Sequence, residues 1–398
     1  MIILINFIRA LFEVLVFPFL LLTTFLGRFS NKPIDIGLGP EPFVSHAYHK
    51  KALESYGYSA QTYVDSVYFI TNQFDVRADN WIKAKSLRKL LLPFIEFVWS
   101  VHRYKCVYIY FNGGPLGLGT VLLWRIEPFL YRIAKSKVIV MPYGGDVQEI
   151  TRSANLLFKD AMTRDYPKQR LRRKRIGTQI DLWTRHADHI IGGCEWVDYM
   201  YHWDTLMLLH FPIDVDRWKQ PELLDKNQVS TIRILHAPNH RAMKGTRFFI
   251  QAVDDLRAEG FNLELILAER VSNDQIHDLM ASVDIIADQL IIGWYAMFAL
   301  EGMAMGKPVL CYLRSDLEDL YITTGLVRPT EIPIVKCSPL TIKDVLRDLI
   351  SNRERIREIG ERSRKFILQH HSLKVIGSVL DEINRSVGII PSGQREDN

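Results

Sequence analysis

The chain has 398 residues, more than one ordinary hydrophobic core accommodates, so two domains are expected. Its apolar fraction of 48% and charged fraction of 24% are typical of globular proteins and exclude general disorder. A net charge of +5 is too small to indicate nucleic-acid binding, although it favours anionic ligands or an anionic membrane surface. The four cysteines lie far apart, which excludes paired-cysteine zinc and redox motifs and fits a reducing, cytoplasmic compartment.

The N-terminal segment MIILINFIRALFEVLVFPFLLLTTFLG is apolar apart from two charges and a few polar residues. It is long enough to cross a hydrocarbon core of roughly 30 Å, but its charges and its proline argue against a clean transmembrane span. A re-entrant or interfacial helix is at least as well supported, and a buried core helix is the alternative. Because Arg28 and Lys32 follow the apolar run, a secretory signal is disfavoured and the rest of the chain is expected to stay cytoplasmic. We expect residues 1–31 to associate with a membrane, so that the protein is peripheral or monotopic at its cytoplasmic face.

From residue 32 onward, apolar strands alternate with amphipathic helices, a pattern typical of parallel sheets with helical crossovers. In the first series a glycine-bearing turn closes the segments PIDIGLG, KCVYIYFNGG, KVIVMPYGGD and HIIGGCEW. Such turns place functional groups along the sheet edge where ligands bind in open α/β folds. We expect an N-terminal domain over residues 32–211.

A second strand–helix series begins after a segment with prolines, charges and no periodicity, which we interpret as a linker over residues 212–230. The second series predicts another open α/β sheet over residues 231–375. Residues 376–398 are expected to form a C-terminal helix and a frayed tail.

The first strand of the second domain, IRILHAPN, is followed by the cations Arg241 and Lys244 just before a helix begins. Cations and helix N-terminal amides are the groups that bind a diphosphate. Solvated loop charges are the alternative interpretation of this segment.

The stretch IGWYAMFALEGMAMGKPVLCY predicts a loop, a helix, a glycine stop and a buried strand. The helix N-terminus is expected near Trp294 and Tyr295, with its amides directed to the ligand site. Glu301 lies about two turns further on and could accept hydrogen bonds from a ribose diol. A surface carboxylate is the alternative, but the apolar neighbours of Glu301 indicate burial.

The segments HAPNHRAMKGT, ADHIIGGCEWV and FPIDVDRW, together with the run from Asp284 to Pro308, resemble the retaining glycosyltransferases of family 4. The resemblance covers the chain from about Ile34 to the tail helices, and the run from Asp284 to Pro308 is its most specific part. It implies an α/β architecture of the GT-B type, in which two Rossmann-like doubly wound domains face a cleft.

In that family a basic pair binds the donor diphosphate, which implies this role for Lys244 and Arg241. Asn239 stands where the family usually has its arginine. The second glutamate of a family pair matches Glu301, implying ribose binding.

The first glutamate of that pair falls on Gly293, so this acid is absent. Gln289, Asp288 or Trp294 could replace it. The donor-binding candidates are thus Asn239, Arg241, Lys244, Gln289, Gly293, Trp294, Tyr295 and Glu301.

The acceptor candidates lie in two glycine turns of the N-terminal domain. PYGGDV puts Tyr143 where the family often has a histidine, and GLGPEP looks like the family's first glycine loop. Asp146 is expected to bind the acceptor, with capping of the next helix as an almost equal alternative. The acceptor-binding candidates are Gly39, Glu41, Tyr143, Gly144 and Asp146.

Three other motifs are weaker. The DVD run Asp214–Asp216 has the two-acid spacing of metal-dependent sugar transfer, but it lies in the linker, so we interpret it as structural and predict no metal. GLGPEP lacks the third glycine of a dinucleotide fingerprint, which disfavours NAD. The basic run Lys168–Arg175 fits a solvated helix face and an anionic-lipid contact equally well.

The sequence therefore predicts a metal-independent, retaining glycosyltransferase with Lys244, Arg241 and Asp146 as its catalytic residues. It would move a sugar from a nucleotide-diphosphate donor to a lipid-linked or membrane-proximal glycan, in polysaccharide or glycolipid biosynthesis. No cofactor is expected besides the nucleotide sugar itself. The missing acid leaves open a second hypothesis, a catalytically silent GT-B protein that binds a nucleotide sugar and scaffolds a membrane assembly complex.

Overall fold

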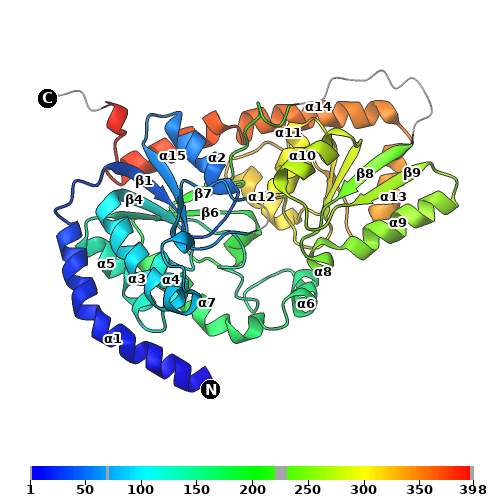
Figure 1. Ribbon diagram of the computed structural model, residues 1–398. Helices are drawn as coiled ribbons and strands as arrows, with labels where there is room; N and C mark the ends of the chain where they lie inside the picture. The colour runs from blue at the N-terminus through cyan, green and yellow to red at the C-terminus, as the bar shows by residue number, and fades with distance from the viewer. Residues whose placement is uncertain (1, 69–70, 220–230, 395–398) are drawn as a thin grey trace. The chain divides into compact units, whose positions relative to one another are not determined.

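The computed structural model describes residues 2–68, 71–219 and 231–394. Its contacts divide the chain into two compact units (Figure 1). Unit 1 comprises Met1–Glu149, Arg172–Leu206 and Gly377–Asn398, and unit 2 comprises Ile150–Leu171 and Met207–Ile376.

Unit 1 is built on a seven-stranded sheet of order β3-β2-β1-β4-β5-β6-β7. The pairs that join β3 through β6 are parallel. The strands are β1 Ile34–Leu38, β2 Ala60–Val64, β3 Val76–Arg77, β4 Tyr104–Ile109, β5 Lys137–Val140, β6 His189–Gly193 and β7 Thr205–Met207. The helices are α1 Ile2–Gly27, α2 Ser45–Glu54, α3 Lys85–Arg103, α4 Pro115–Gly119, α5 Glu127–Ile133, α7 Arg173–His186 and α15 Leu373–Ser386, with short 3-10 turns at η1 Ala78–Asn80, η2 Leu123–Arg125, η4 Cys194–Asp198 and η5 Ser392–Gln394.

Unit 2 is built on a five-stranded parallel sheet of order β12-β11-β10-β8-β9. The strands are β8 Ile232–His236, β9 Leu263–Leu267, β10 Ile285–Gln289, β11 Val309–Cys311 and β12 Val335–Lys336. The helices are α6 Leu156–Asp165, α8 Arg241–Lys244, α9 Thr246–Ala258, α10 Asn273–Ala281, α11 Met297–Ala304, α12 Ser315–Thr323, α13 Ile342–Ile350 and α14 Arg353–His370, with the 3-10 turn η3 Gln169–Leu171. Apolar side chains of the central strands pack with α9 and α13 in its core.

The alternation of strands and helices thus forms two parallel sheets with helical crossovers, which confirms the predicted fold class. The compact units nevertheless differ in extent from the expected domains. Residues 150–171 pack in unit 2, because the Asn155 amide donates to the Ile291 carbonyl over 2.7 Å and the Asp165 carboxylate accepts the Met243 N–H over 2.8 Å. Most of the expected linker, residues 220–230, lies outside the described residues.

The C-terminal segment from Gly377 packs in unit 1. Tyr58 donates to Asp381 over 2.7 Å, Tyr108 donates to Asn384 over 3.0 Å, and Ser392 donates to Asp35 over 2.6 Å. These bonds tie the segment to β1, β4 and the loop before β2. Up to residue 394 the tail is therefore docked rather than frayed, and residues 395–398 of the predicted tail lie outside the described residues.

The predicted apolar N-terminal segment is present as the single helix α1. From Leu4 to Gly27 it is long and apolar enough to cross a membrane, although a core helix or a signal sequence meets the same criterion. Its hydrophobicity alone therefore does not establish membrane association.

Candidate functional site

The residues predicted to bind the diphosphate lie in unit 2, close to the C-terminal ends of β8 and its neighbour β10. Lys244 closes the short helix α8, and α9 begins two residues later at Thr246. The Lys244 ammonium lies 2.6 Å from Oδ1 of Asp288, whose side chain is fully buried on β10. A buried carboxylate that holds a lysine fixes the position of its charge, and the N–H groups that open a helix add partial positive charge.

His236, at the end of β8, is a positioning residue that the sequence patterns did not single out. It is fully buried; its Nδ1 lies 2.7 Å from the Ala287 carbonyl oxygen and its Nε2 lies 2.9 Å from the Thr246 hydroxyl. Burial lowers its pKa to about 4, so the ring is neutral at pH 7. His236 thereby joins β8, β10 and the first residue of α9.

Arg241 and Asn239 are not held beside Lys244 in the way that Asp288 is. The Arg241 guanidinium makes a bidentate ion pair with Glu269, with N–O distances of 2.8 and 2.7 Å, and its side chain is 56% exposed. Asn239 is exposed in the preceding loop. For Arg241 to contact a diphosphate, its ion pair with Glu269 would have to exchange, and solvent-exposed pairs contribute little to stability.

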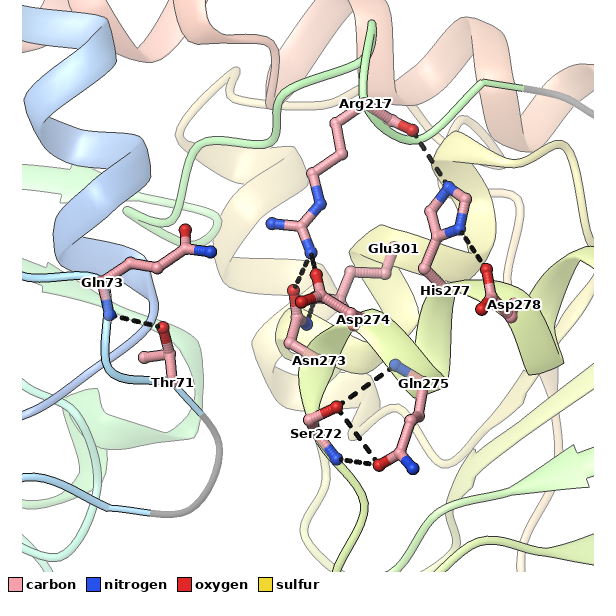
Figure 2. Close-up of polar contacts among 10 residues, drawn as sticks. All are labelled: Thr71, Gln73, Arg217, Ser272, Asn273, Asp274, Gln275, His277, Asp278 and Glu301. Atoms are coloured by element: carbon pink, nitrogen blue, oxygen red, sulfur yellow. Dashed lines mark hydrogen bonds and ion pairs between the residues drawn. The ribbon is translucent and has the colours of Figure 1, made fainter.

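Glu301 is buried on α11, as its apolar neighbours predicted. Its Oε1 accepts a hydrogen bond from the Asn273 amide over 2.8 Å, and Arg217 in turn donates to Asn273 and Asp274 (Figure 2). Burial raises the pKa of Glu301 to about 8, with the Asn273 hydrogen bond and the Arg217 charge opposing the increase. A buried carboxyl with one fixed oxygen leaves the other for a further hydrogen-bond partner.

Gln289 has a structural role in the same unit. Its Oε1 accepts the N–H groups of Ile291 and Ile292 at 2.8 and 2.6 Å, and its Nε2 donates to the Trp294 and Tyr312 carbonyls at 3.1 and 2.8 Å. The amide is therefore occupied in holding the loop after β10 and is not available to replace the missing acid.

Trp294 and Tyr295 also point into the core. The indole N–H donates to the Leu208 carbonyl over 2.9 Å, the Tyr295 hydroxyl lies 3.1 Å from Nε2 of His371, and both side chains are 1% exposed. The helix that they were expected to open begins later, at Met297. Any contact of this pair with a ligand is thus limited to backbone atoms.

Gly293 has a backbone φ of +106°, a region that side-chain-bearing residues rarely adopt. A Cβ atom there would lie 2.8 Å from Cδ of Arg314, whose guanidinium pairs with Asp316. The loop geometry therefore requires glycine at the position where the resembling family has its first glutamate.

In unit 1, Asp146 follows β5 and is fully buried. Its oxygens accept the backbone N–H groups of Phe111, Tyr143 and Gly144 at 3.0, 3.0 and 2.9 Å. Burial raises its pKa to about 6, and these hydrogen bonds oppose the increase. The carboxylate thus holds together the turns that follow β4 and β5, a structural role that leaves it poorly suited to catalysis.

Glu41, in the turn after β1, has the opposite environment. It is 6% exposed, and neither carboxyl oxygen has a hydrogen-bond partner among the described residues. Burial, followed by the charge of Asp65, raises its pKa well above the usual value, and the nearby Asn112 side chain opposes the increase. Gly39, two residues earlier, has no room for a side chain, since a Cβ would lie 2.1 Å from the Tyr63 carbonyl oxygen.

Aromatic rings surround the same strand ends. The centroid of the Phe43 ring lies 4.4 Å from that of Tyr143 and 5.2 Å from that of Tyr110, and Tyr143 accepts a hydrogen bond from Asn112 over 2.7 Å. Gly144 continues the turn after Tyr143. Sequence patterns predicted Tyr143 and the glycine turns, whereas Phe43 and Asn112 were not singled out. The glycine turn after Asn112 was the available signal for that residue, and Phe43 directly follows the GLGPEP loop.

Asp214 of the linker motif accepts the N–H groups of Asp216 and Arg217, each over 3.2 Å, so it supports a turn. Within residues 2–68, 71–219 and 231–394, the structure brings together no group of three or more His, Cys, Asp or Glu side chains suited to a metal ion. Metal independence and the absence of a cofactor remain predictions.

Solved structures of similar fold extend these observations. The structure of Anabaena HepE in complex with UDP-glucose has a TM-score of 0.57 at 12% identity, covering 88% of this chain and 99% of that one. Sucrose-phosphate synthase from Thermosynechococcus elongatus has a TM-score of 0.56 at 10% identity, covering 89% of this chain and 99% of that one. No protein-family model matches the sequence, and no curated protein sequence matches it.

These structural neighbours are GT-B glycosyltransferases, and at such low identities the likeness establishes the fold. The chain thus has the GT-B fold of two Rossmann-like domains. A fold alone does not define an activity, which depends on the chain's own site residues.

Proposed function

We propose that the chain is a retaining, metal-independent glycosyltransferase that uses a nucleotide-diphosphate sugar. The observation that carries the proposal is the Lys244–Asp288 pair, 2.6 Å apart, directly before the helix α9. It supplies a fixed positive charge at a helix N-terminus, which is what a diphosphate requires. Glu301, on the helix that follows the neighbouring strand β10, supplies a carboxyl for the ribose hydroxyls. The neighbour HepE was solved with UDP-glucose, which supports this class of donor.

The chemistry needs no covalent nucleophile. The bond between the anomeric carbon and the diphosphate oxygen breaks, and the acceptor oxygen bonds to the same face of that carbon. The acceptor proton passes to an oxygen of the leaving diphosphate, as is proposed for the resembling family. The Lys244 ammonium and the first N–H groups of α9 stabilise the negative charge that develops on the leaving group, with Arg241 available once it exchanges from Glu269.

For the acceptor, the structure favours Glu41 over Asp146. Asp146 already accepts three backbone N–H groups, whereas both oxygens of Glu41 lack partners among the described residues. The Phe43 and Tyr143 rings offer the apolar contact surface that a sugar ring needs. We propose that a lipid-linked or membrane-proximal glycan presents its hydroxyl at this position, at the cytoplasmic face of a membrane.

Donor turnover by the purified protein tests the proposal. The protein is incubated with UDP-, GDP-, ADP- and TDP-sugars and a membrane extract, and transfer and donor hydrolysis are both measured. A thermal-shift series with the same donors selects the base, because a ligand that binds only the folded state stabilises it. We expect turnover with one donor, lost in Lys244→Ala and retained in Lys365→Ala, an exposed lysine on α14.

The second candidate is the catalytically silent GT-B protein that binds a nucleotide sugar and scaffolds a membrane assembly complex. The observation that favours it is the geometry of Gly293, which excludes the family acid from its usual position. Tight, selective donor binding without turnover against any membrane extract would establish this alternative and overturn the enzyme.

A further inference from the structure

The helix α1 has two different faces. Its inward stripe carries Glu13, which is 2% exposed and lies near the middle of the helix. The Glu13 carboxylate accepts the backbone N–H groups of Val121, Leu122 and Leu123 at 2.6, 2.7 and 3.1 Å. These N–H groups open the 3-10 turn η2, so Glu13 caps that turn from another helix.

Two further polar contacts hold the same stripe. Arg9, one turn before Glu13, donates from its guanidinium to the Gly119 carbonyl oxygen at the end of α4. Nε2 of His102, near the end of α3, lies 2.9 Å from the Thr23 carbonyl oxygen. Both charged side chains of α1 are therefore held by unit 1, and α1 lies along α3 and α5 (Figure 1).

The outward face of α1 is apolar along its whole length. Its large side chains are between 46% and 71% exposed, among them Leu4, Phe7, Leu11, Leu15, Phe19 and Leu26. Leu118 and Leu122, next to the backbone groups that Arg9 and Glu13 hold, extend this surface with 49% and 39% exposure. Soluble proteins rarely expose an apolar surface of this extent without a partner.

Cations adjoin this surface within unit 1. The Arg125 and Arg175 guanidinium groups lie 4.4 and 4.9 Å from the centre of the Trp124 ring, in the turn that Glu13 caps. Arg175 is partly buried and donates to the Thr120 carbonyl oxygen over 3.3 Å, whereas Arg125 and Arg172 are exposed and can contact headgroups. An apolar helix face beside a group of arginines matches the acyl chains and the headgroups of an anionic lipid surface.

We propose that α1 lies flat in the surface of an anionic membrane as a monotopic helix and does not span the bilayer. Spanning would remove Glu13 from three backbone N–H groups and would carry Glu13 and Arg9 into the hydrocarbon, where charges are costly. A protein partner would require a polar rim around the apolar contact, whereas the outward face presents hydrocarbon side chains from Phe7 to Leu26. This inference does not depend on the proposed glycosyl transfer.

Depth measurements on the full chain distinguish a flat helix from a spanning one. Single cysteines replace Leu4, Leu15 and Leu26, which lie near the start, middle and end of the outward face. Because all four native cysteines are buried, an added thiol is labelled selectively with a fluorophore. Quenchers at fixed depths in phosphatidylcholine–phosphatidylglycerol vesicles then report each position.

The flat helix predicts the same shallow depth at all three positions. A spanning helix predicts the greatest depth at position 15 and the opposite leaflet at position 4, which would overturn the proposal. Absence of quenching together with self-association of the protein would also overturn it, because a second copy would then cover the face.

Flotation with vesicles compares matched variants of the chain. Leu15→Glu with Phe19→Glu alters only exposed positions and is expected to abolish vesicle binding, while circular dichroism and the midpoint of thermal unfolding stay unchanged. Arg125→Gln and Arg172→Gln are each expected to weaken binding to phosphatidylglycerol-containing vesicles about fivefold, with little change for phosphatidylcholine alone. Equal flotation of the double glutamate variant and the unmodified chain would contradict the proposal. None of these readouts uses a sugar substrate, so a failure here is separate from a failure of the proposed activity.

Discussion

The ends of the strands in the two units carry different kinds of polar groups. In unit 2, Lys244 pairs with Asp288 and Arg241 pairs with Glu269, so the charges are balanced before any ligand arrives. In unit 1, Glu41 is buried without a partner among the described residues, and burial favours its uncharged form. The same type of sheet thus presents fixed charges in one unit and a neutral, aromatic-rich environment in the other.

The difference matches two classes of ligand. Lys244 can donate its remaining N–H bonds to phosphate oxygens while the buried Asp288 stays paired, and Arg241 can exchange the exposed Glu269 for them. A neutral carboxyl beside aromatic rings suits a sugar, which offers hydroxyl groups and apolar C–H faces and has no charge. The comparison predicts that unit 2 determines binding of the donor and unit 1 determines use of the acceptor.

The largest expected effect belongs to Lys244. Lys244→Ala should reduce transfer about 100-fold to 1,000-fold, because a preorganised positive charge on the leaving group is lost. Isothermal titration with the nucleotide diphosphate and initial-rate assays measure the loss. Since the variant leaves Asp288 buried and unpaired, the double variant Lys244→Ala/Asp288→Asn restores neutrality and should have the same defect. Full activity in the double variant would show that Lys244 does not bind the diphosphate.

Glu41→Gln tests the acceptor half of the comparison. Transfer should fall about 10-fold, because the amide N–H is a weaker donor than the O–H of a neutral carboxyl group, while donor affinity stays unchanged. The KM for the acceptor and the donor Kd are measured separately, with Glu54→Gln on α2 as the exposed control. A fall in donor affinity without a change in the acceptor KM would contradict the prediction that unit 1 binds the acceptor.

Glu301→Gln should change the pH dependence of both stability and donor binding. The pKa of Glu301 rises from 4.5 to about 8 on folding, so the folded chain keeps a proton that the unfolded chain releases between these values. Stability is therefore lost as pH rises through this window, by up to about 1.4 kcal/mol per pH unit from this group. Ribose hydroxyls favour the carboxylate, so donor affinity should rise with pH towards 8 in the unmodified chain.

In Glu301→Gln both slopes should flatten, and donor affinity above pH 8 should fall about tenfold. Urea denaturation and donor titration across this pH range measure the two slopes, with the exposed Glu358→Gln as control. Unchanged pH profiles in Glu301→Gln would show that this carboxyl neither titrates nor binds the nucleotide.

The smallest expected effect on chemistry belongs to Asp146. Asp146→Asn keeps one oxygen acceptor but weakens bonds to three backbone N–H groups, so the free energy of unfolding should fall by about 1–3 kcal/mol. Transfer at saturating acceptor should change little. A loss of transfer much larger than the loss of stability would return Asp146 to the catalytic role that the sequence suggested.

The sequence patterns predicted the two parallel sheets, because strand–helix alternation is a local property that each segment carries by itself. They also predicted the burial of Glu301 from its apolar neighbours, and the structure confirms it. The packing of residues 150–171 in unit 2 depends on contacts such as Asn155 with Ile291, which are far apart in sequence. No local pattern carries that information.

The roles of individual side chains were the least predictable part. Trp294 and Tyr295 stand in a glycine-led loop, where exposed and buried aromatic residues have the same sequence signal; their partners Leu208 and His371 decide their burial. Asp146 and Glu41 are both acids after strands, and only the backbone N–H groups that surround Asp146 distinguish them.

Gly293 has a consequence for engineering and for natural variation. Restoring the missing acid takes a single amino-acid substitution in the sequence. At φ +106°, with Arg314 2.8 Å from the first side-chain atom, such a mutant would have to rebuild the loop as well. The structure therefore does not accommodate the acid by substitution alone, and a design that restores it would need to change Arg314 and the backbone of this loop together.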